Sequence, residues 1–281
     1  MAGLDKNVLF CLNGESFEDS SYNKIAITNN NLTEANIIDE EIDGHPIKCI
    51  DFNTTNGYLS FNLDDNFFNG AWTIDWWEKD GDYTSLSGLF TNMVTSSGNY
   101  FGIGRYQSGT NTFVNMASSG SYFINTQAVG NDKVGEWVHR AIVFNGVDKY
   151  DFYENGTLFK TTTNTKKAYN GKSAFQMGKW RATTTVLNRK VYNFRVSNIA
   201  RYTEDFTPEV KKYEKESISI DINIDNLLEG ATLVDISNKI KEIKEANNLL
   251  TESLKEILTS KGIEVEENDK LKDLISKVNY I

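Results

Sequence analysis

Short runs of alternating apolar and polar residues, separated by turn residues, fill the first three quarters of the chain. Residues 190–197 are a clear case, with apolar side chains at Val191, Tyr192, Phe194 and Val196. Alternation of this kind is typical of a strand with one buried face. The same pattern predicts further strands over residues 7–12, 24–28, 47–52, 57–63, 71–79, 87–94, 99–105, 112–116, 121–125, 137–145, 148–154, 157–162 and 173–179.

The gaps between these runs have the chemistry of tight turns. Asn-Gly or Asp-Gly pairs stand at positions 56–57, 69–70, 80–81, 145–146 and 155–156. Such pairs favour the left-handed backbone that hairpin turns require. Many short strands joined by turns of this type predict an all-β sandwich over residues 1–213.

The pattern changes near Lys211. Residues 217–225 place four isoleucines on one face of a predicted strand. Thr232 and Asp235 then have the spacing of a capping box, and Gly262 marks a stop, so we expect a helix that ends at Lys261. A second, short helix is expected from about residue 268. We therefore divide the chain into a sandwich (1–213), a strand or linker (214–230) and a helical module (231–281).

The predicted long helix carries apolar residues at heptad spacing. Its a and d positions hold Leu233, Ile236, Ile240, Ile243, Asn247, Leu250, Leu254 and Ile257. Asn247 is the one polar residue among them, and an Asn at position a sets register and strand number at a cost in stability. We expect a self-associating coiled coil and favour a homotrimer. A hairpin in which 269–279 folds back on 233–257 is the alternative, and Lys239 and Lys244 would repel each other across parallel chains.

Composition and charge narrow the class of protein. The chain has 281 residues, of which 39% are hydrophobic and 12% aromatic, enough for a sizeable core. Its net charge is −10, which disfavours nucleic acid or an anionic membrane surface as a partner. The sequence contains no transmembrane-length apolar run and no signal-peptide pattern, so we expect folding in a cytoplasm. Cys11 and Cys49 are therefore expected as reduced, buried thiols, and a single bridge between neighbouring strands is the alternative.

Several motifs occur in the order found in a known family. They are DKNVL (5–9), WTIDWWEKD (72–80), GEWVHRAIVFNG (135–146), YDFYENGTLF (150–159) and ARYTEDFTP (200–208). Together they resemble the laminin-G/concanavalin-A-like lectin domain of bacteriophage virion proteins of the tail or capsid. Residues 254–278 are similar to C-terminal helical modules of phage structural proteins. One departure is Arg140, which stands where the family usually has an aliphatic residue, so we expect its strand to be exposed on one side.

The resemblance implies a concanavalin-A-like jelly-roll sandwich in a virion surface protein. It favours binding of host-surface carbohydrate by the sandwich, with residues 214–281 anchoring the protein to other virion proteins after synthesis in the cytoplasm of a bacterial host. The alternative is a purely structural capsid decoration (minor capsid) protein, or a tail or baseplate accessory protein, that has no glycan ligand.

A polysaccharide hydrolase is a third hypothesis, which the sequence disfavours. Glycosidases need two carboxylates that face one groove, and alternate strand residues share a face. Asp75 and Glu78 are three residues apart, so we expect them on opposite faces. His139 lies in a strand and is expected to be packed, and His45 has no partner at metal-ligand spacing. We therefore expect no catalytic residues and no enzyme activity.

Aromatic and polar residues at predicted strand ends are candidates for a carbohydrate site, because sugars stack on aromatic rings while polar groups bind their hydroxyls. The candidates are Trp180, Arg181, Arg105, Tyr106, Asp80, Asp82 and Tyr83. Asp80 and Asp82 could also hold Ca²⁺, although exposed loop carboxylates without metal are far commoner, and no other cofactor is expected. Trp76 and Trp77 are adjacent, so we expect one in the core and the other on an outer face or under a loop.

Overall fold

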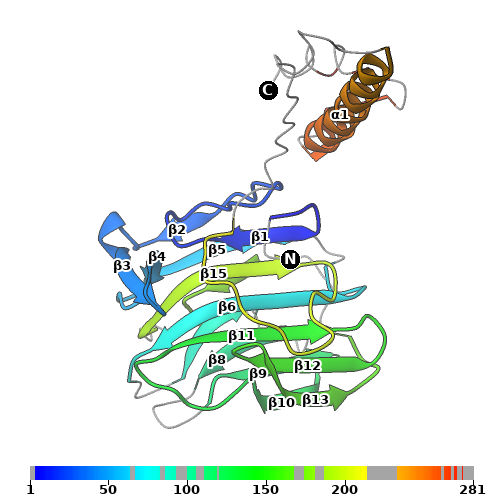
Figure 1. Ribbon diagram of the computed structural model, residues 1–281. Coiled ribbons are helices and arrows are strands. Elements are labelled where there is room, and N and C mark those ends of the chain that lie inside the picture. Colours follow the sequence, from blue (N-terminus) through cyan, green and yellow to red (C-terminus); the bar gives the residue numbers. More distant parts are fainter. Residues whose placement is uncertain are drawn as a thin grey trace. The chain divides into compact units, whose positions relative to one another are not determined.

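Two antiparallel sheets stack face to face in the larger part of the protein (Figure 1). A computed structural model describes residues 4–63, 67–82, 86–92, 100–105, 111–118, 120–167, 174–180, 187–213, 233–260, 263–266, 269–270 and 274. The chain divides into two units, Met1–Lys215 and Glu216–Ile281. The first unit contains both sheets and the second contains a helix, and each is described by itself.

One sheet has eight strands. Its order is β13 (Thr157–Thr163), β12 (Lys149–Glu154), β11 (Trp137–Phe144), β6 (Trp72–Asp80), β15 (Arg189–Ser197), β4 (His45–Asp51) and β3 (Ile37–Ile42), and β1 (Val8–Leu12) also pairs with β15. The seven-stranded sheet runs β10 (Ser121–Ala128), β9 (Phe113–Ser118), β8 (Tyr100–Arg105), β7 (Ser87–Thr91), β14 (Ala174–Met177), β5 (Tyr58–Asn62) and β2 (Thr28–Asn30). A short 3₁₀ helix, η1 (Glu34–Asn36), precedes β3. The all-β sandwich predicted from the sequence is confirmed.

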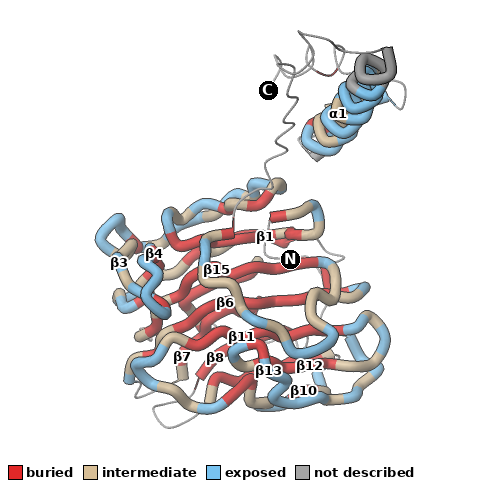
Figure 2. The backbone as a smooth tube through the Cα atoms, in the orientation of Figure 1, coloured by how far each residue is buried: buried red, intermediate tan, exposed pale blue. Residues whose placement is uncertain are grey.

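The core forms where the inner faces of the sheets meet. Because strand side chains alternate, β6 sends Trp72, Ile74 and Trp76 inward, and all three are fully buried. Phe90 and Phe175 stack from the facing sheet with their ring centroids 4.8 Å apart. Figure 2 shows this buried backbone as red strands through the centre of the unit. Burial of these large apolar side chains supplies most of the driving force for folding.

The outer face of the eight-stranded sheet is also covered, because the chain crosses it after β15. We call residues 198–213 the exit segment (yellow in Figure 1). Trp77 points outward from β6, and its Nε1 donates a hydrogen bond of 3.1 Å to the Glu209 carbonyl of this segment. Val210 packs over the cluster that contains Trp77 and Tyr192. The expectation that Trp76 and Trp77 lie on opposite sides, one in the core and one under a loop, is confirmed.

The inner face of β6 continues beyond Trp76 with charged residues. Trp76 Nε1 donates to Glu78 at 2.7 Å, and Arg140 Nε donates to Glu78 at 3.0 Å. Arg189 lies 3.3 Å from the same carboxylate. Arg140 also pairs with Glu154, and only 2% of it is exposed. The expectation of an exposed strand at Arg140 is therefore wrong, because this arginine takes part in buried ion pairs between the sheets.

Two strands differ from the sequence prediction. β2 spans Thr28–Asn30 rather than residues 24–28, and β3 has no predicted counterpart. β3 forms because Asp43 and Gly44 adopt positive φ angles of 49° and 81° and make a two-residue hairpin turn. This turn places Ile42 opposite His45 and pairs β3 with β4.

The second unit contains α1 (Leu233–Ser260), close to the helix predicted from the capping box to Lys261. The expected strand at 217–225, the cap residue Thr232, the stop at Gly262 and most of the second helix lie outside the described residues. Leu258 and Leu274 are both fully buried. Within the described part of the chain, α1 lacks the apolar character of a helix that could cross a bilayer.

Candidate functional site

Asn193 fastens the exit segment to the sheet. It adopts a positive φ of 49°, and the pairing of β15 with β6 shifts register between Tyr192 and Arg195. The resulting bulge aims the Asn193 side chain outward, where its amide nitrogen donates to the Lys211 carbonyl at 2.9 Å and its oxygen accepts the Tyr213 amide at 3.3 Å. A sheet irregularity therefore holds the last part of the exit segment in place.

The first part of the exit segment is held from β6. Thr73 Oγ1 donates to the Ile199 carbonyl at 2.8 Å and accepts the Arg201 amide at 2.9 Å. The Arg201 guanidinium makes two hydrogen bonds to Asp5, of 3.0 and 3.1 Å. Both ends of the segment are thus fixed, and its middle passes over the sheet.

A buried ion pair forms the floor beneath this arch. Arg195 donates two hydrogen bonds to Asp75, and the Tyr202 hydroxyl donates a third to the same carboxylate at 2.6 Å. Burial alone would raise the pKa of Asp75, but the charge and hydrogen bonds of Arg195 hold it below its ordinary value. The Tyr213 ring lies over the Arg195 guanidinium with a centroid distance of 4.0 Å, a cation–π contact.

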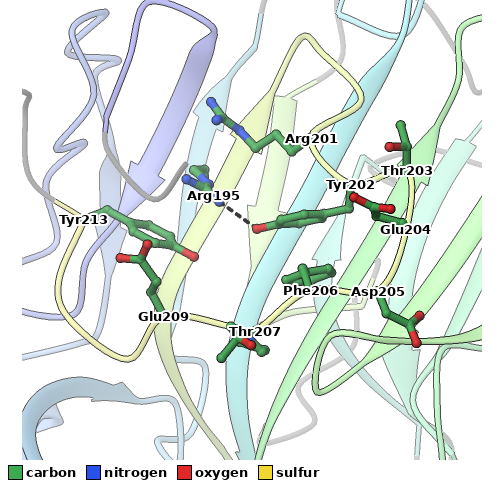
Figure 3. A pocket seen from close by; sticks show the side chains of 11 residues that line it. Arg195, Arg201, Tyr202, Thr203, Glu204, Asp205, Phe206, Thr207, Glu209 and Tyr213 are labelled. Carbon is green, nitrogen blue, oxygen red and sulfur yellow. Dashed lines mark hydrogen bonds between the residues drawn. The ribbon is translucent and has the colours of Figure 1, made fainter.

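A cavity of about 200 Å³ opens between the exit segment and this floor. We call it the exit cleft. Figure 3 shows Tyr213 and Glu209 on one side of it and Tyr202 with Phe206 on the other, with Arg195 between them and Thr207 at the edge. Aromatic rings, hydroxyl groups and a carboxylate therefore surround one small space.

Phe206 and Tyr202 form the aromatic side of the exit cleft. Their rings stack with centroids 3.6 Å apart and planes inclined by 5°. Phe206 also meets the edge of His139, which in turn contacts Trp77. Both ring nitrogens of His139 are without a hydrogen-bond partner in the described part of the chain, and burial lowers its pKa to about 4. His139 is therefore a neutral packing residue behind the cleft, in keeping with the sequence interpretation.

The rim of the exit cleft is acidic. Its two arginines are each balanced, Arg195 by Asp75 and Arg201 by Asp5. The exposed Glu204 and Asp205 add negative charge at the rim, and Glu209 adds a carboxylate that pairs with Lys211 at 3.5 Å. The cleft therefore suits a neutral or positively charged polar ligand better than an anion.

A second cavity of about 410 Å³ lies beside β4, lined in part by His45, Lys48, Tyr192 and Lys212. Lys48 pairs with Asp39 and Lys212 with Glu15, each at 2.9 Å. Among the described residues that line it, Tyr192 and His45 are the aromatic ones. The second cavity offers fewer stacking surfaces than the exit cleft.

The site residues nominated from the sequence do not gather at the exit cleft. Trp180 is 4% exposed and packs edge-on against Phe113 at 5.6 Å, while a side chain at Gly104 would touch its ring. An indole enclosed on both faces has no surface on which a sugar can stack. The structure thus places Trp180 in a small core cluster with Tyr100 and Ala117.

Arg105 and Asp80 are likewise internal. Arg105 donates to Asp80 at 2.6 Å and pairs with Asp132, and Arg189 also binds Asp80. These guanidinium groups fill the coordination positions that a Ca²⁺ at Asp80 would need. Asp82 is exposed, and Tyr83, Tyr106 and Arg181 lie outside the described residues. The described residues contain no group of three or more potential metal ligands.

Sequence reasoning did not nominate the exit cleft. The segment ARYTEDFTP stands out in the sequence as a family motif but has no alternation that would place it over a sheet. The outward face of β6 and β15 carried a usable signal. It combines the large apolar ring of Trp77 with the opposite charges of Asp75 and Arg195, a combination that indicates a covered face, and all three side chains are buried.

Comparison with known proteins gives one family match. Residues 53–205 match the family model described as the concanavalin A-like lectin/glucanases superfamily, laminin G type. No curated protein matches the sequence.

Solved structures with the same fold include toxin binding domains. The binding domain of botulinum neurotoxin serotype D has a TM-score of 0.53 at 12% identity, with 70% of this chain and 48% of that chain covered. A structure of botulinum neurotoxin type C, whose cell entry depends on interaction with two ganglioside molecules, gives 0.52 at 11% identity, covering 70% and 49%. A binding domain of botulinum neurotoxin DC in complex with SialylT gives 0.50 at 10%, covering 70% and 49%. The aligned region spans about half the length of these structures, and at such identity the likeness shows the fold.

Proposed function

The chain belongs to the concanavalin A-like lectin/glucanases superfamily, and from this membership we propose that it is a carbohydrate-binding protein whose exit cleft takes one sugar ring. The observation that carries the proposal is the cleft itself. It sets the stacked rings of Tyr202 and Phe206 beside a space bordered by the carboxylate of Glu209 and the hydroxyl of Thr207, and the lining also includes Tyr213, which is 2% exposed. Sugars are bound by this combination of aromatic faces and hydrogen-bonding groups.

The size and charge of the cleft define the ligand class. Its volume of about 200 Å³ is below the roughly 300–1,000 Å³ of sites that enclose drug-sized ligands, so we expect a single ring rather than an enclosed oligosaccharide. The acidic rim favours a neutral sugar or an amino sugar. A sialic acid would bring its carboxylate against Glu209 and is expected to bind more weakly.

The surroundings of the carboxylates on β6 also fit a binding role better than they fit a role in hydrolysis. Glu78 and Asp80 are the pair that shares a face of β6, but both are buried among arginines. Burial alone would raise the pKa of Glu78, yet Arg189 and Arg140 lower it, whereas a general acid needs a raised pKa. We therefore propose that the protein binds carbohydrate without cleaving it.

The test is a screen of neutral, amino and sialylated sugars on a glycan array, followed by titration calorimetry of the best ligand. Glu209→Gln replaces the cleft carboxylate with a neutral amide, Tyr213→Phe removes a hydroxyl group, and both keep the shape of the side chain. Each is expected to weaken binding about tenfold, whereas Glu18→Gln, which changes an exposed carboxylate elsewhere, leaves it unchanged. Unchanged binding in both cleft variants overturns the site. An array without any bound sugar overturns the function.

The biological setting is a further part of the proposal. The sequence motifs over 1–213 and 254–278 support a bacteriophage virion protein that is made in the host cytoplasm and attached to other virion proteins through residues 214–281. Mass spectrometry of purified particles tests it, since a virion component co-purifies with them at constant stoichiometry. A protein found in particles that binds no sugar would instead be a structural decoration or tail accessory protein.

A further inference from the structure

One face of α1 exposes a continuous row of apolar side chains. Ile240, Ile243, Leu250 and Ile257 are each 38–49% exposed. With Asn247 and Leu254 they occupy successive a and d heptad positions, and we call these six residues the α1 seam. Large apolar side chains in such a row are normally covered by a partner.

The buried apolar side chains in the described part of the second unit lie outside the α1 seam. Leu258, at the end of the helix, is fully buried, as is Leu274. The Ile263 amide donates to the Leu258 carbonyl at 3.0 Å, a bond typical of a helix C-terminus. Among the described residues, the α1 seam is therefore exposed while Leu258 at the helix end is buried.

We propose that the α1 seam binds copies of this same chain, as a parallel three-stranded coiled coil that makes the sandwich multivalent. Asn247 supports a parallel, in-register arrangement, because a polar residue at one a position is best accommodated opposite its own copies. Isoleucine at d, as at Ile243 and Ile257, disfavours two strands and favours higher numbers.

Charge opposes this arrangement only weakly. In a parallel coil, Lys244 at position e lies near Lys239 at position g of the next chain. Repulsion between lysines at e and g positions costs much less than the burial of an isoleucine or leucine side chain gains. The apolar seam and Asn247 therefore decide the orientation.

Trimerisation has a consequence for ligand binding, which rests on the proposed carbohydrate site. A cleft of about 200 Å³ makes few contacts, so one copy is expected to bind weakly. When one copy in a trimer binds a surface that displays many sugars, the other two copies are held at a high effective concentration near further sugars. This raises the overall affinity about 100-fold or more without any new contact.

Light scattering of the full chain during size-exclusion chromatography tests the oligomer without any ligand. Three times the mass of one chain is expected for the natural protein and for Leu249→Glu, which changes an exposed residue off the seam. Leu250→Glu places a charge in the seam and is expected to give a monomer. A monomeric natural protein overturns the proposal, as does a Leu250→Glu variant that keeps the trimer.

Orientation is tested by cysteine cross-linking. Ile240→Cys lies at an a position, so a parallel, in-register coil forms a disulfide between copies on mild oxidation. An antiparallel pair places residue 240 far from its own copy and forms none, which contradicts the proposal. The two natural cysteines are buried, which leaves the engineered thiol as the reactive one.

The multivalent step is tested by comparing two measurements. Leu250→Glu is expected to bind a soluble monosaccharide as well as the natural protein does, and a sugar-coated surface about 100-fold more weakly. Equal binding to the surface overturns the multivalent role. If the natural protein binds no soluble sugar, the proposed carbohydrate site is wrong. The mass measurement still decides whether the α1 seam forms a trimer.

Discussion

Arg195 and Asp75 face each other from the neighbouring strands β15 and β6, joined by hydrogen bonds of 3.0 and 2.6 Å. Both side chains are almost completely buried under the exit segment. Burial of a charged pair is costly unless other groups compensate it, and here the Tyr202 hydroxyl hydrogen-bonds to both partners while the Tyr213 ring lies over the Arg195 guanidinium. The pair thus connects the stability of the sandwich to the position of the exit cleft.

Asp75→Asn is expected to destabilise the sandwich by about 3–5 kcal/mol, because it leaves Arg195 as an uncompensated buried charge. Urea unfolding followed by tryptophan fluorescence measures this, since all five tryptophans lie between residues 72 and 180. Asp39→Asn is the matched control. It breaks an exposed ion pair with Lys48 and is expected to cost at most about 1 kcal/mol. Equal effects of the two substitutions would contradict a structural role for the Asp75 pair.

Glu78→Gln is expected to destabilise the same unit by about 3 kcal/mol or more, because Arg140 and Arg189 both lose the charge they share. Glu78 lies on the inner face of β6 because it takes part in these buried ion pairs between the sheets, and not because it lines a catalytic groove. The exposed Glu18→Gln variant controls for the amide substitution and should unfold like the natural protein. A Glu78→Gln variant of natural stability would mean that the buried pairs are weak.

The fold could be predicted from sequence because its main determinant, apolar alternation between Asn-Gly and Asp-Gly turns, is local. β6 shows this, since the alternation in WTIDWWEKD predicts that Trp76 and Trp77 point to opposite sides of the sheet, one of them into the core. β3 escaped prediction because IIDEEI has charges in consecutive positions and is held by pairing with β4 through the Asp43-Gly44 turn. Pairing between strands depends on residues far apart in the sequence, and the alternation within one segment does not show it.

The candidate site could not be predicted in the same way. Trp180 and Arg105 stand near predicted strand ends, which suggests exposure, but Arg105 is buried in ion pairs with Asp80 and Asp132, and Trp180 packs on the outer face of the seven-stranded sheet with Tyr100 and Phe113. The exit cleft depends on how residues 198–213 cross β6 and β15. That path is set by the bulge at Asn193 and by single hydrogen bonds from Thr73 and Trp77. The contacts of Thr73 and Trp77 join residues more than a hundred positions apart, and none of these contacts leaves a periodic signal in the sequence.

His139→Phe is expected to reduce the pH dependence of stability. In the natural protein, burial and the charges of Arg195 and Arg140 oppose protonation of His139 while Asp75 favours it, and its pKa is lowered to about 4. The unfolded chain takes up a proton near the ordinary value of about 6.5, so stability falls as the pH drops from 6.5 to 4 by about 3 kcal/mol.

Phenylalanine keeps the aromatic contacts with Trp77 and Phe206 and removes the titrating group. Unfolding free energies measured between pH 7.5 and 4 should therefore show a flatter curve for His139→Phe. The carboxylates titrate in both proteins and cancel in the comparison. Parallel curves for the two proteins would show that His139 is not the group responsible.

Gly156→Ala is expected to displace the exit segment and destroy the cleft. Gly156 has a φ of +77°, and a Cβ there would overlap the Phe206 carbonyl oxygen, while the Phe206 amide donates to the Gly156 carbonyl at 2.9 Å. Gly44→Ala provides a close control, because Gly44 has a similar φ of +81° with no atom near the added Cβ. The backbone cost of about 1–2 kcal/mol is common to both substitutions. The contact with Phe206 therefore decides the difference.

We expect Gly156→Ala to be less stable than Gly44→Ala in urea, to be cleaved by protease within residues 201–213, and to lose sugar binding that Gly44→Ala retains. Equal stability and equal binding in the two variants would show that the cleft does not depend on this contact.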